Sequence, residues 1–534
     1  MKDITSQRYD NGKPKLRRFH QARWDEAVIF ELSTAGQRGI LVPEVDREIL
    51  EKVGNPASEL PPGVRRESPP ALPEMGQLQV LRHYLRLSQE NLGLDLNIDV
   101  GQGTCTMKYS PKINDQLASL PTMTELHPLQ DESTAQGILE IYYRMAQILK
   151  EVSGMDHFTF QPQAGSQAIY TNVSIIRAYH ESRGDGRKRN EVITTIFSHP
   201  SNAACAKTAG YNVITLYPDA DGYPDLEALM AAVSDRTAAL MITNPEDTGI
   251  YNPRIAEFTR MVHDAGGLCC YDQANANGIL GMTRAREAGF DLCHFNLHKT
   301  FSTPHGCGGP GAGASGVTEK LAPFLPVPTV EFDGAQYHLA YDRPQSIGKI
   351  RSFYGVAPVV LKAYAWVMSL GAEGLRRAAE TAVLNNNYLL KKMLSIRGVS
   401  APYAEGKRRI EQVRYGLEQV TKDTGVRSEE IGIRAADFGV HYWTSHHPFV
   451  VPEPATLEPT ESFSKADLDE YADIIAHVVQ EAYEDPERVK TAPHCSTVHS
   501  IDHHPLDDPA QWAVTWRAYR RKVTGRKRQN SGKP

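Results

Sequence analysis

Short apolar runs alternate with helical stretches of roughly ten residues between positions 190 and 300. The runs expected to form strands are 191–197, 212–217, 237–243, 268–271 and 292–297. The stretches expected to form helices are 201–210, 224–233 and 253–265. This alternation is typical of βαβ units and predicts a mainly parallel sheet with helices on both faces. Functional side chains of such a sheet gather at the carboxyl ends of its strands.

Apolar positions at a helical period predict further helices on both sides of this region. The expected ranges are 75–95, 137–152, 359–370, 375–394 and 464–483. Ser464 stands at the N-cap of the last one, with Asp467 at the third helical position. Residues 1–75 are rich in proline and charge and show little periodicity. We expect this segment to be an arm that wraps a partner or the main domain.

Composition narrows the class of protein. The chain has 534 residues, 41% of them hydrophobic and 23% charged, with a formal net charge of −6. This length suits two domains plus extensions, and the charge balance gives no reason to expect binding to nucleic acid or membranes. No apolar run approaches about 18 residues, and the first residues resemble neither a signal nor a transit peptide. We therefore expect a cytoplasmic protein.

Cysteine and histidine patterns do not favour a metal site. Seven cysteines occur without a Cys-x-x-Cys pair, which indicates reduced thiols. Cys269 and Cys270 are adjacent in a predicted strand, so they point to opposite faces and serve packing. The C-terminal histidines lack the spacing of zinc ligands; they are His494, His499, His503 and His504. We expect no bound metal.

One lysine, Lys299, follows an apolar run and precedes a loop rich in Ser, Thr, His and Gly. Burying an ammonium group is costly without a partner. A lysine held out of water has a lowered pKa and can form a Schiff base. The alternative is a surface lysine in a glycine-rich loop, and for an isolated Lys-Thr pair that alternative is the more common one.

Four predicted strands end in polar side chains, which are His199, Asn244, Asp272 and Lys299. Any one of them could be a turn former. Four at one edge of a parallel sheet favour a functional site.

Pyridoxal phosphate (PLP) needs a lysine for the Schiff base, a carboxylate for the pyridine nitrogen and an anion-binding turn. Lys299 would be the Schiff-base lysine and Asp272 the pyridinium partner. Ser166 and Gln167 open a predicted helix, where free N–H groups and the helix dipole would hold the phosphate. A plain helix cap is the alternative for that turn. His199 would stack on the ring. We therefore predict catalytic roles for Lys299, His199 and Asp272.

Three further polar residues leave two interpretations open. Lys108 either meets a substrate carboxylate or forms an ordinary salt bridge. His441 and Glu461 either face the cleft or have packing roles.

Beyond these residues the chain resembles the P-proteins of the glycine cleavage system. The most specific matches are Cys-Thr-Met-Lys-Tyr at 105–109 and Glu-Pro-Thr-Glu at 458–461. Further matching segments lie in the family's order at 127–130, 161–167, 243–249, 272–275, 296–300, 346–348 and 353–355. Together they cover about residues 95 to 500.

This resemblance implies a fold and an activity. The fold would be the PLP-dependent type I, or aspartate-aminotransferase-like, fold with a smaller C-terminal α+β domain. The activity would be glycine decarboxylation, followed by transfer of an aminomethyl group to the lipoyl arm of a carrier, the H-protein. The resemblance also implies cofactor contacts by Asn244, Ala274 and His298, and a second, alpha-type P-protein subunit in an α2β2 assembly.

The implied organisation is an N-terminal extension at 1–125, a large PLP-binding domain at 126–345, and a small C-terminal domain with a tail at 346–534. Some segments beside the cofactor depart from the family pattern, at Ser166, Ile169, 199–205 and Gln273. An alternative is therefore a divergent stand-alone PLP enzyme, a decarboxylase, lyase or aminotransferase, that acts on another small amino acid.

Overall fold

The computed structural model of the protein describes residues 9–10, 13–14, 16–66, 68–93, 95–100, 108–303, 311–403, 405–442, 450–497, 512–513 and 515–522. The chain divides into two units. Unit 1 comprises Met1–Arg17 and Leu94–Ala492, and unit 2 comprises Arg18–Gly93 and Pro493–Pro534.

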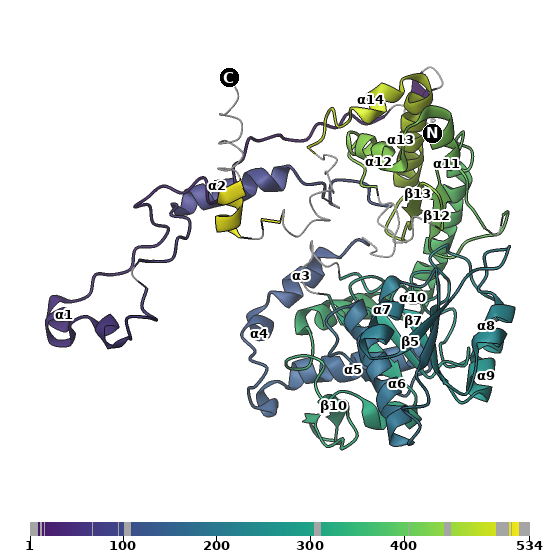
Figure 1. Cartoon of the computed structure of the whole chain (residues 1–534), viewed down its shortest axis with the longest axis horizontal. Helices are drawn as coiled ribbons and strands as arrows, with labels where there is room; N and C mark the ends of the chain where they lie inside the picture. Colours follow the sequence, from purple (N-terminus) through teal and green to yellow (C-terminus); the bar gives the residue numbers. More distant parts are fainter. Residues whose placement is uncertain are drawn as a thin grey trace. The chain divides into compact units, whose positions relative to one another are not determined.

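A seven-stranded sheet forms the centre of unit 1, in the order β3-β9-β8-β7-β6-β4-β5 (Figure 1). Its strands are β3 His157–Thr159, β4 Glu191–Thr195, β5 Asn212–Leu216, β6 Thr237–Thr243, β7 Leu268–Gln273, β8 Leu292–Asn296 and β9 Gly313–Val317. The strands from β4 to β8 are parallel, and β9 and β3 join them as antiparallel neighbours. The prediction of a mainly parallel sheet is confirmed.

Helices cover both faces of this sheet, because its central strands are apolar on both sides. One face packs against α5 Gln136–Ser153, α8 Leu226–Ala232, α9 Ile255–Asp264 and α10 Ala357–Met393. The other packs against α6 Gly165–Ser182 and α7 Pro200–Thr208. Cys269 belongs to the first apolar cluster and Cys270 to the second, so the predicted split of this pair is confirmed.

The C-terminal part of unit 1 has its own apolar cluster. The antiparallel pair β12 Val413–Gly416 and β13 Pro454–Leu457 lies among the helices α11 Glu418–Thr424, α12 Ser428–Ala436, α13 Lys465–Glu484 and α14 Pro486–Lys490. Ser464 and Asp467 form the predicted capping box of α13. The two predicted helices at 359–370 and 375–394 lie within α10, and they are separated by a kink at Gly371, whose φ of +63° is not helical.

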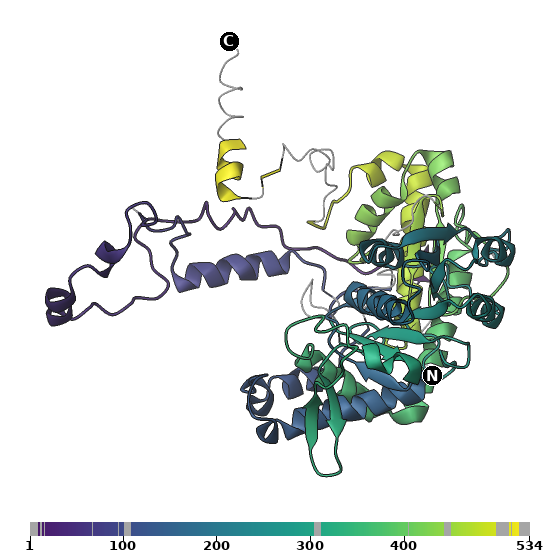
Figure 2. The same cartoon turned by 60° about the horizontal axis from the view of Figure 1, so that its bottom comes forward.

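Shorter elements complete unit 1. They are β1 Tyr9–Asp10, β2 Lys13–Pro14, α3 Lys112–Ala118, α4 Pro121–Thr124, η3 Glu132–Thr134, η4 Glu319–Phe324, β10 Thr329–Phe332 and β11 Tyr337–Ala340. β10 and β11 form a hairpin that projects at the bottom of Figure 2.

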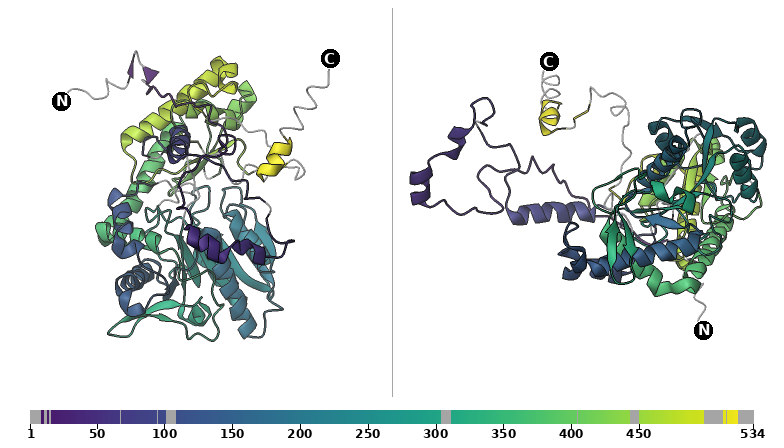
Figure 3. Two further views of the ribbon diagram at one scale, coloured as in Figure 1. Left: turned by 90° about the vertical axis from the view of Figure 1, so that its left-hand side faces the viewer. Right: turned by 90° about the horizontal axis from the view of Figure 1, so that it is seen from below.

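Among its described residues, unit 2 is mostly extended chain with four short elements, which are α1 Arg47–Val53, η2 Pro56–Glu59, α2 Gln77–Gln89 and a helix at 516–522 (Figure 3). Its two segments meet where the Gln21 amide N–H donates to the carbonyl of Cys495. In α2, His83 is buried and its Nδ1 lies 2.8 Å from Glu26 Oε1. The arm expected at the N-terminus therefore contains some regular structure.

The ends of two strands differ from the prediction in ways that affect the site. β4 ends at Thr195, and a turn follows it before His199. β7 continues through Asp272 to Gln273, whereas the predicted strand stops at position 271. A charged residue at a strand end suggested a boundary, but Asp272 has hydrogen-bond donors that make its burial tolerable. Among the residues that the structure describes, none of the helices is both long and apolar enough to cross a membrane.

Candidate active site at the carboxyl edge of the sheet

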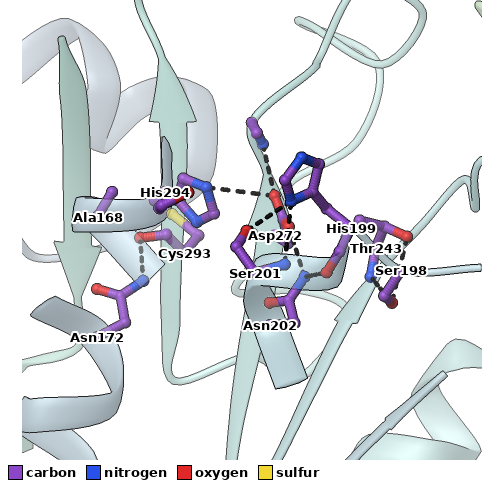
Figure 4. Close-up of polar contacts among 12 residues, drawn as sticks. Ala168, Asn172, Ser198, His199, Ser201, Asn202, Thr243, Asp272, Cys293 and His294 are labelled. Atoms are coloured by element: carbon purple, nitrogen blue, oxygen red, sulfur yellow. Dashed lines mark hydrogen bonds and ion pairs between the residues drawn. The ribbon is translucent and has the colours of Figure 1, made fainter. Parts of the chain in front are cut away.

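Asp272 is 4% exposed and three groups contact its carboxylate (Figure 4). The backbone N–H of Ala274 donates to Oδ1 over 3.0 Å, and the side-chain amide of Asn202 donates to Oδ2 over 2.7 Å. The third group is His294, whose Nε2 lies 3.2 Å from Oδ1. This last contact is within ion-pair distance, although it is not aligned as a hydrogen bond. The carboxylate is therefore held from three directions.

Strand register explains why His294 and Asp272 meet. The two residues are paired across the parallel strands β7 and β8, and side chains that are level on neighbouring strands share a face. This is the face covered by α6 and α7, and Asn202 reaches Asp272 from the first turn of α7. The site is thus built by two strands and one helix start.

Opposing effects set the charge of Asp272. Burial raises the pKa of its carboxyl, but the neighbouring imidazoles of His294 and His199 and its hydrogen bonds together outweigh burial. The pKa of Asp272 therefore lies below its ordinary value. Burial lowers the pKa of the His294 imidazole, Lys299 lowers it further, and Asp272 raises it only in part. We assign an ionised Asp272 beside a neutral His294.

Lys299 lies in a buried turn just after β8 and is 5% exposed. Its backbone N–H donates to the carbonyl of Asn296 over 3.0 Å. Because β7 and β8 are neighbouring parallel strands, Asp272 near the end of β7 and Lys299 just after β8 lie at the same edge of the sheet.

Lys108 holds the turn that carries Lys299. Its Nζ donates to the carbonyl of Thr300 over 2.8 Å and lies 3.1 Å from Glu461 Oε2. It also lies 4.6 Å from the centre of the Trp366 ring. Of the two roles left open for Lys108, the structure shows the salt bridge, and Glu461 is its partner. His441 is likewise paired, with Nδ1 3.0 Å from Asp99 Oδ1.

The start of α6 has the features of an anion-binding turn. The helix begins at Gly165, directly before Ser166 and Gln167, and Ala164 supplies no side-chain cap. The first N–H groups of a helix have no partner within the helix. Gly165 must be small, because a Cβ there would lie 2.6 Å from Asn296 Nδ2. The side chain of Gln167 accepts from Gln163 N and donates to Ile350 O, so the backbone rather than this amide is available to a phosphate.

His199 is the N-cap of α7. Its Nδ1 accepts from the Ser201 amide N–H and lies 2.5 Å from Ser201 Oγ, which fixes the ring. Figure 4 shows this ring next to Asp272, and its charge contributes to the lowered pKa of that carboxyl. The position suits a group that lies against a ring bound to Asp272.

Three residues predicted as cofactor contacts make hydrogen bonds within the protein. The side chain of Asn244 accepts from Asn252 N over 2.8 Å and donates to its carbonyl. His298 Nδ1 accepts from Ala312 N over 3.2 Å. Ala274 uses its amide N–H to hold Asp272. Asn244 and Ala274 thus position loops at the edge of the sheet, and the cofactor contacts predicted for all three stay predictions.

Glu411 is a buried acid that interacts electrostatically with Lys299. Glu411 is 2% exposed, and burial raises the pKa of its carboxyl well above the ordinary value. The charges of Glu458 and Asp247 raise it further, and that of Lys299 lowers it. Glu458 in turn accepts a hydrogen bond from Asn277 Nδ2 over 3.2 Å. Burial therefore holds the carboxyl of Glu411 in its protonated form.

The residues around Asp272 fit the cofactor predicted from the sequence. A carboxylate offers about four lone-pair positions, and three groups contact Asp272. The two hydrogen bonds and the His294 contact leave the carboxylate able to accept the N–H of a protonated pyridine. Lys299 would form the Schiff base and the start of α6 would hold the phosphate.

One further cluster of potential metal ligands occurs among the described residues. The ligand atoms of His263, Cys269 and Asp291 lie within 4.8 Å of one another. Asp291 already accepts from His263 Nε2 and Cys269 N and lies 2.5 Å from Lys320 Nζ. These contacts satisfy its carboxylate, so we interpret the cluster as a network of ion pairs and hydrogen bonds and not as a metal site.

Some predicted features lie outside the described residues. They are the Cys-Thr-Met part of the Cys-Thr-Met-Lys-Tyr segment and the histidines at 499, 503 and 504.

The sequence reasoning missed two residues of the site, His294 and Asn202. His294 could have been found from strand alternation, because β8 directly follows β7 in the sheet and position 294 is level with Asp272. No sequence pattern indicated Asn202, since it reaches Asp272 through the packing of α7.

Two family models match the chain. The aminotransferase class-V model matches residues 171–413, and the model of the glycine dehydrogenase C-terminal domain matches residues 378–500. The predictions of a PLP-dependent type I fold and of pyridoxal phosphate as the cofactor are confirmed.

Solved structures share this fold. A crystal structure of glycine decarboxylase (P-protein) of the glycine cleavage system, in inhibitor-bound form, matches with a TM-score of 0.68 and 20% identity, covering 82% of this chain and all of that one. A NifS-like protein matches with a TM-score of 0.55 and 14% identity, covering 72% of this chain and 99% of that one.

Curated relatives match over nearly the whole chain. A protein of Pyrococcus horikoshii is 45% identical over 504 residues, which is 94% of this chain and 98% of the relative. A protein of Caldanaerobacter subterraneus is 46% identical over 478 residues, 89% of this chain and 96% of the relative. Both are named probable glycine dehydrogenase (decarboxylating) subunit 2. The P-protein resemblance is confirmed, and the chain belongs to the family of glycine dehydrogenase (decarboxylating) subunit 2.

Proposed function

We propose that this chain is the PLP-carrying catalytic subunit of a two-subunit glycine dehydrogenase (decarboxylating). It removes the carboxyl group of glycine as CO₂ and passes the aminomethyl group to the lipoyl arm of an H-protein. The observation that carries the proposal is the buried Asp272 and Lys299 at one edge of the sheet, in a chain whose relatives bear this name.

The residues of the site would divide the work. When bound, pyridoxal phosphate supplies a ring that withdraws electrons from the substrate carbon next to the nitrogen. Lys299 would hold the cofactor through its side-chain amine. Asp272, whose pKa is lowered, would hold a proton on the ring nitrogen. His199 would lie against the ring, and the start of α6, with Ser166 and Gln167 in its first turn, would hold the phosphate.

Glu411 would control charge near the lysine. Its protonated carboxyl adds no negative charge next to Lys299, whose amine must be unprotonated to act as a nucleophile. A neutral acid is also easier to bury than an ion. Lys108 keeps the turn in place through Thr300.

The decisive experiment measures CO₂ release from a panel of small amino acids labelled in the carboxyl group. The purified chain is assayed with and without an alpha-type subunit and a lipoylated H-protein. We expect glycine to be the one amino acid of the panel from which CO₂ is released. We also expect the rate of release to depend strongly on the alpha-type subunit and on the H-protein. Release from another amino acid without the carrier would support the divergent stand-alone enzyme instead.

The arm in unit 2 supports the proposal of a second subunit. The helix α2 exposes about half of each of several apolar side chains, which are Leu78, Leu81, Tyr84 and Leu85. Ile40, Leu41 and Val42 are more than three-quarters exposed. Exposed apolar segments of this size mark interaction surfaces. We therefore propose that the arm binds the alpha-type subunit and that the complex is an α2β2 assembly.

Co-expression with an alpha-type subunit and light scattering after size exclusion would test this assembly. We expect the mass of two chains of each kind. The change Leu81→Asp together with Leu85→Asp should release the alpha-type subunit. Met230→Asp on α8, at a residue of similar exposure, is the matched control and should leave the complex intact. A complex that survives the double change would contradict the proposed role of α2.

A further inference from the structure

His294 faces Asp272 from the neighbouring strand and is completely buried. Ser315 is its partner on the other neighbouring strand, β9, and Lys299 is the nearby cation. The imidazole lies on the face that α6 covers, and Figure 4 shows it beside Ala168 and the Asp272 carboxylate. Among the described residues neither ring nitrogen has an aligned hydrogen-bond partner, and its one polar contact is that of Nε2 with Asp272. A buried imidazole with one polar contact needs an explanation.

We propose that His294 is a positioning residue which, through Asp272, sets where the proton lies between that carboxylate and the ring nitrogen of the bound cofactor. The inference rests on the proposed cofactor site but not on the identity of the amino acid substrate.

The chemistry follows from how a carboxylate shares a proton with a pyridine. A donor to the ionised carboxylate stabilises that form and makes it a weaker base. The shared proton then stays on the ring nitrogen, and the ring remains the better electron sink. Without a donor the carboxylate becomes more basic, so the proton moves from the ring nitrogen to the carboxyl oxygen. No other bond forms or breaks in this transfer.

The neutral state of His294 gives it this role. A neutral imidazole has one N–H donor and one acceptor nitrogen. With the proton on Nε2, the N–H of His294 would lie on the nitrogen that is 3.2 Å from Asp272 Oδ1, close enough to act on that carboxylate. Asn202 and the Ala274 amide hold the carboxylate from other directions. Of the three groups that contact Asp272, His294 is the one that belongs to β8, the strand that Lys299 follows.

Two substitutions of His294 distinguish its role as a hydrogen-bond donor from a role in packing. In His294→Gln the side-chain amide reaches the position of Nε2 and keeps a neutral donor. In His294→Asn the amide is one methylene shorter and cannot reach Asp272. His180→Asn is the matched control, since His180 is also a buried imidazole, with Nε2 2.9 Å from Ala238 O on another part of the sheet.

The full-length protein is loaded with pyridoxal phosphate labelled with ¹⁵N in the ring, and the resonance is recorded without substrate. We expect a protonated ring nitrogen in the native protein, in His294→Gln and in His180→Asn. In His294→Asn the resonance should move toward the unprotonated position. Glycine-dependent kcat should fall roughly tenfold or more in that variant with little change in KM, since a polar contact with a charged group is lost. An unmoved resonance in His294→Asn, or an equal movement in His294→Gln, would overturn the inference.

A second measurement needs no substitution. In native protein with ¹⁵N-labelled histidine, His294 should be neutral with its proton on Nε2. A charged imidazole or a proton on Nδ1 would contradict the proposal even if every variant failed to fold. If the ring resonance behaves as expected but no variant releases CO₂ from glycine, the role of His294 stands and the proposed function fails.

Discussion

The side-chain amine of Lys108 donates a hydrogen bond of 2.8 Å to the backbone carbonyl of Thr300, the residue directly after Lys299. The same amine pairs with Glu461 at 3.1 Å, and it is almost completely buried. Residues nearly two hundred positions apart are joined by this contact. It fixes the turn that carries the lysine on which the chemistry depends.

Removing one partner of this ion pair should be more harmful than removing both. Lys108→Met leaves Glu461 as a largely buried charge without its cation, which typically costs about 3–5 kcal/mol. We expect a marked fall in Tm. The double variant Lys108→Met with Glu461→Gln should recover part of that loss. Single and double variants with the same Tm would show that the pair contributes no coupling.

Asp272→Asn should keep the cofactor but lose most of the activity. An amide cannot carry the negative charge that holds a proton on the ring nitrogen, whereas Lys299 can still bond to the cofactor. We expect kcat for CO₂ release from glycine to fall at least a hundredfold. Absorbance of the bound cofactor, read before glycine is added, checks loading. Near-normal exchange of CO₂ into glycine would refute the role given to Asp272.

Lys299→Ala should remove the covalent link between protein and cofactor. Borohydride reduction of the loaded native protein followed by peptide mass analysis should place the cofactor on Lys299. The variant should show no labelled peptide and no turnover. Lys320→Ala is the control, since Lys320 pairs with Asp291 in another part of the structure. Normal turnover by Lys299→Ala would end the assignment.

Glu246 predicts a particular pH dependence of stability. Burial raises the pKa of its carboxyl to about 8, against 4.5 for an ordinary glutamate. Between these two values the folded state holds a proton that the unfolded state has lost. This group therefore makes stability fall as pH rises, by about 1.4 kcal/mol per pH unit, and the loss is complete above pH 8.

Glu246→Gln removes this titration and keeps a neutral polar side chain beside Thr195. The fall in Tm between pH 5 and pH 8.5 should be smaller in the variant than in the native protein. Parallel curves for the two proteins would show that Glu246 does not titrate in this range.

The structure predicts that position 249 cannot accommodate the methyl group of an alanine. Its φ is +77°, and an added Cβ would lie 1.7 Å from the carbonyl oxygen of Gln412. The Ile410 N–H donates to the Gly249 carbonyl over 2.8 Å, so this contact holds the segment that carries Glu411. Gly249→Ala should lower Tm strongly and weaken cofactor binding, because that segment must move.

Gly348→Ala is the matched control for Gly249→Ala. Gly348 also has a positive φ, of +84°, but nothing lies within 4 Å of an added Cβ. Its cost should be limited to the backbone strain, of about 1 kcal/mol. Equal losses in the two variants would mean that the contact with Gln412 is unimportant.

Much of the architecture could be predicted from local sequence patterns. The strands from β4 to β8 and the capping box at Ser464 follow from apolar periodicity and cap chemistry, which act over a few residues. The placement of Asp272 and Lys299 at one edge of the sheet followed from the rule that functional side chains gather where parallel strands end. Strand ends were less certain, because Asp272 lies inside β7 only through donors supplied from elsewhere in the fold.

What the sequence determined by itself was the order of elements and the kind of chemistry, since both depend on residues close together along the chain. Only the tertiary structure decided which side chains complete the site. Asn202 reaches Asp272 from a helix start, His294 meets it through strand register, and Lys108 arrives from far along the chain. Contacts of this kind depend on packing and register, and these are properties of the whole fold.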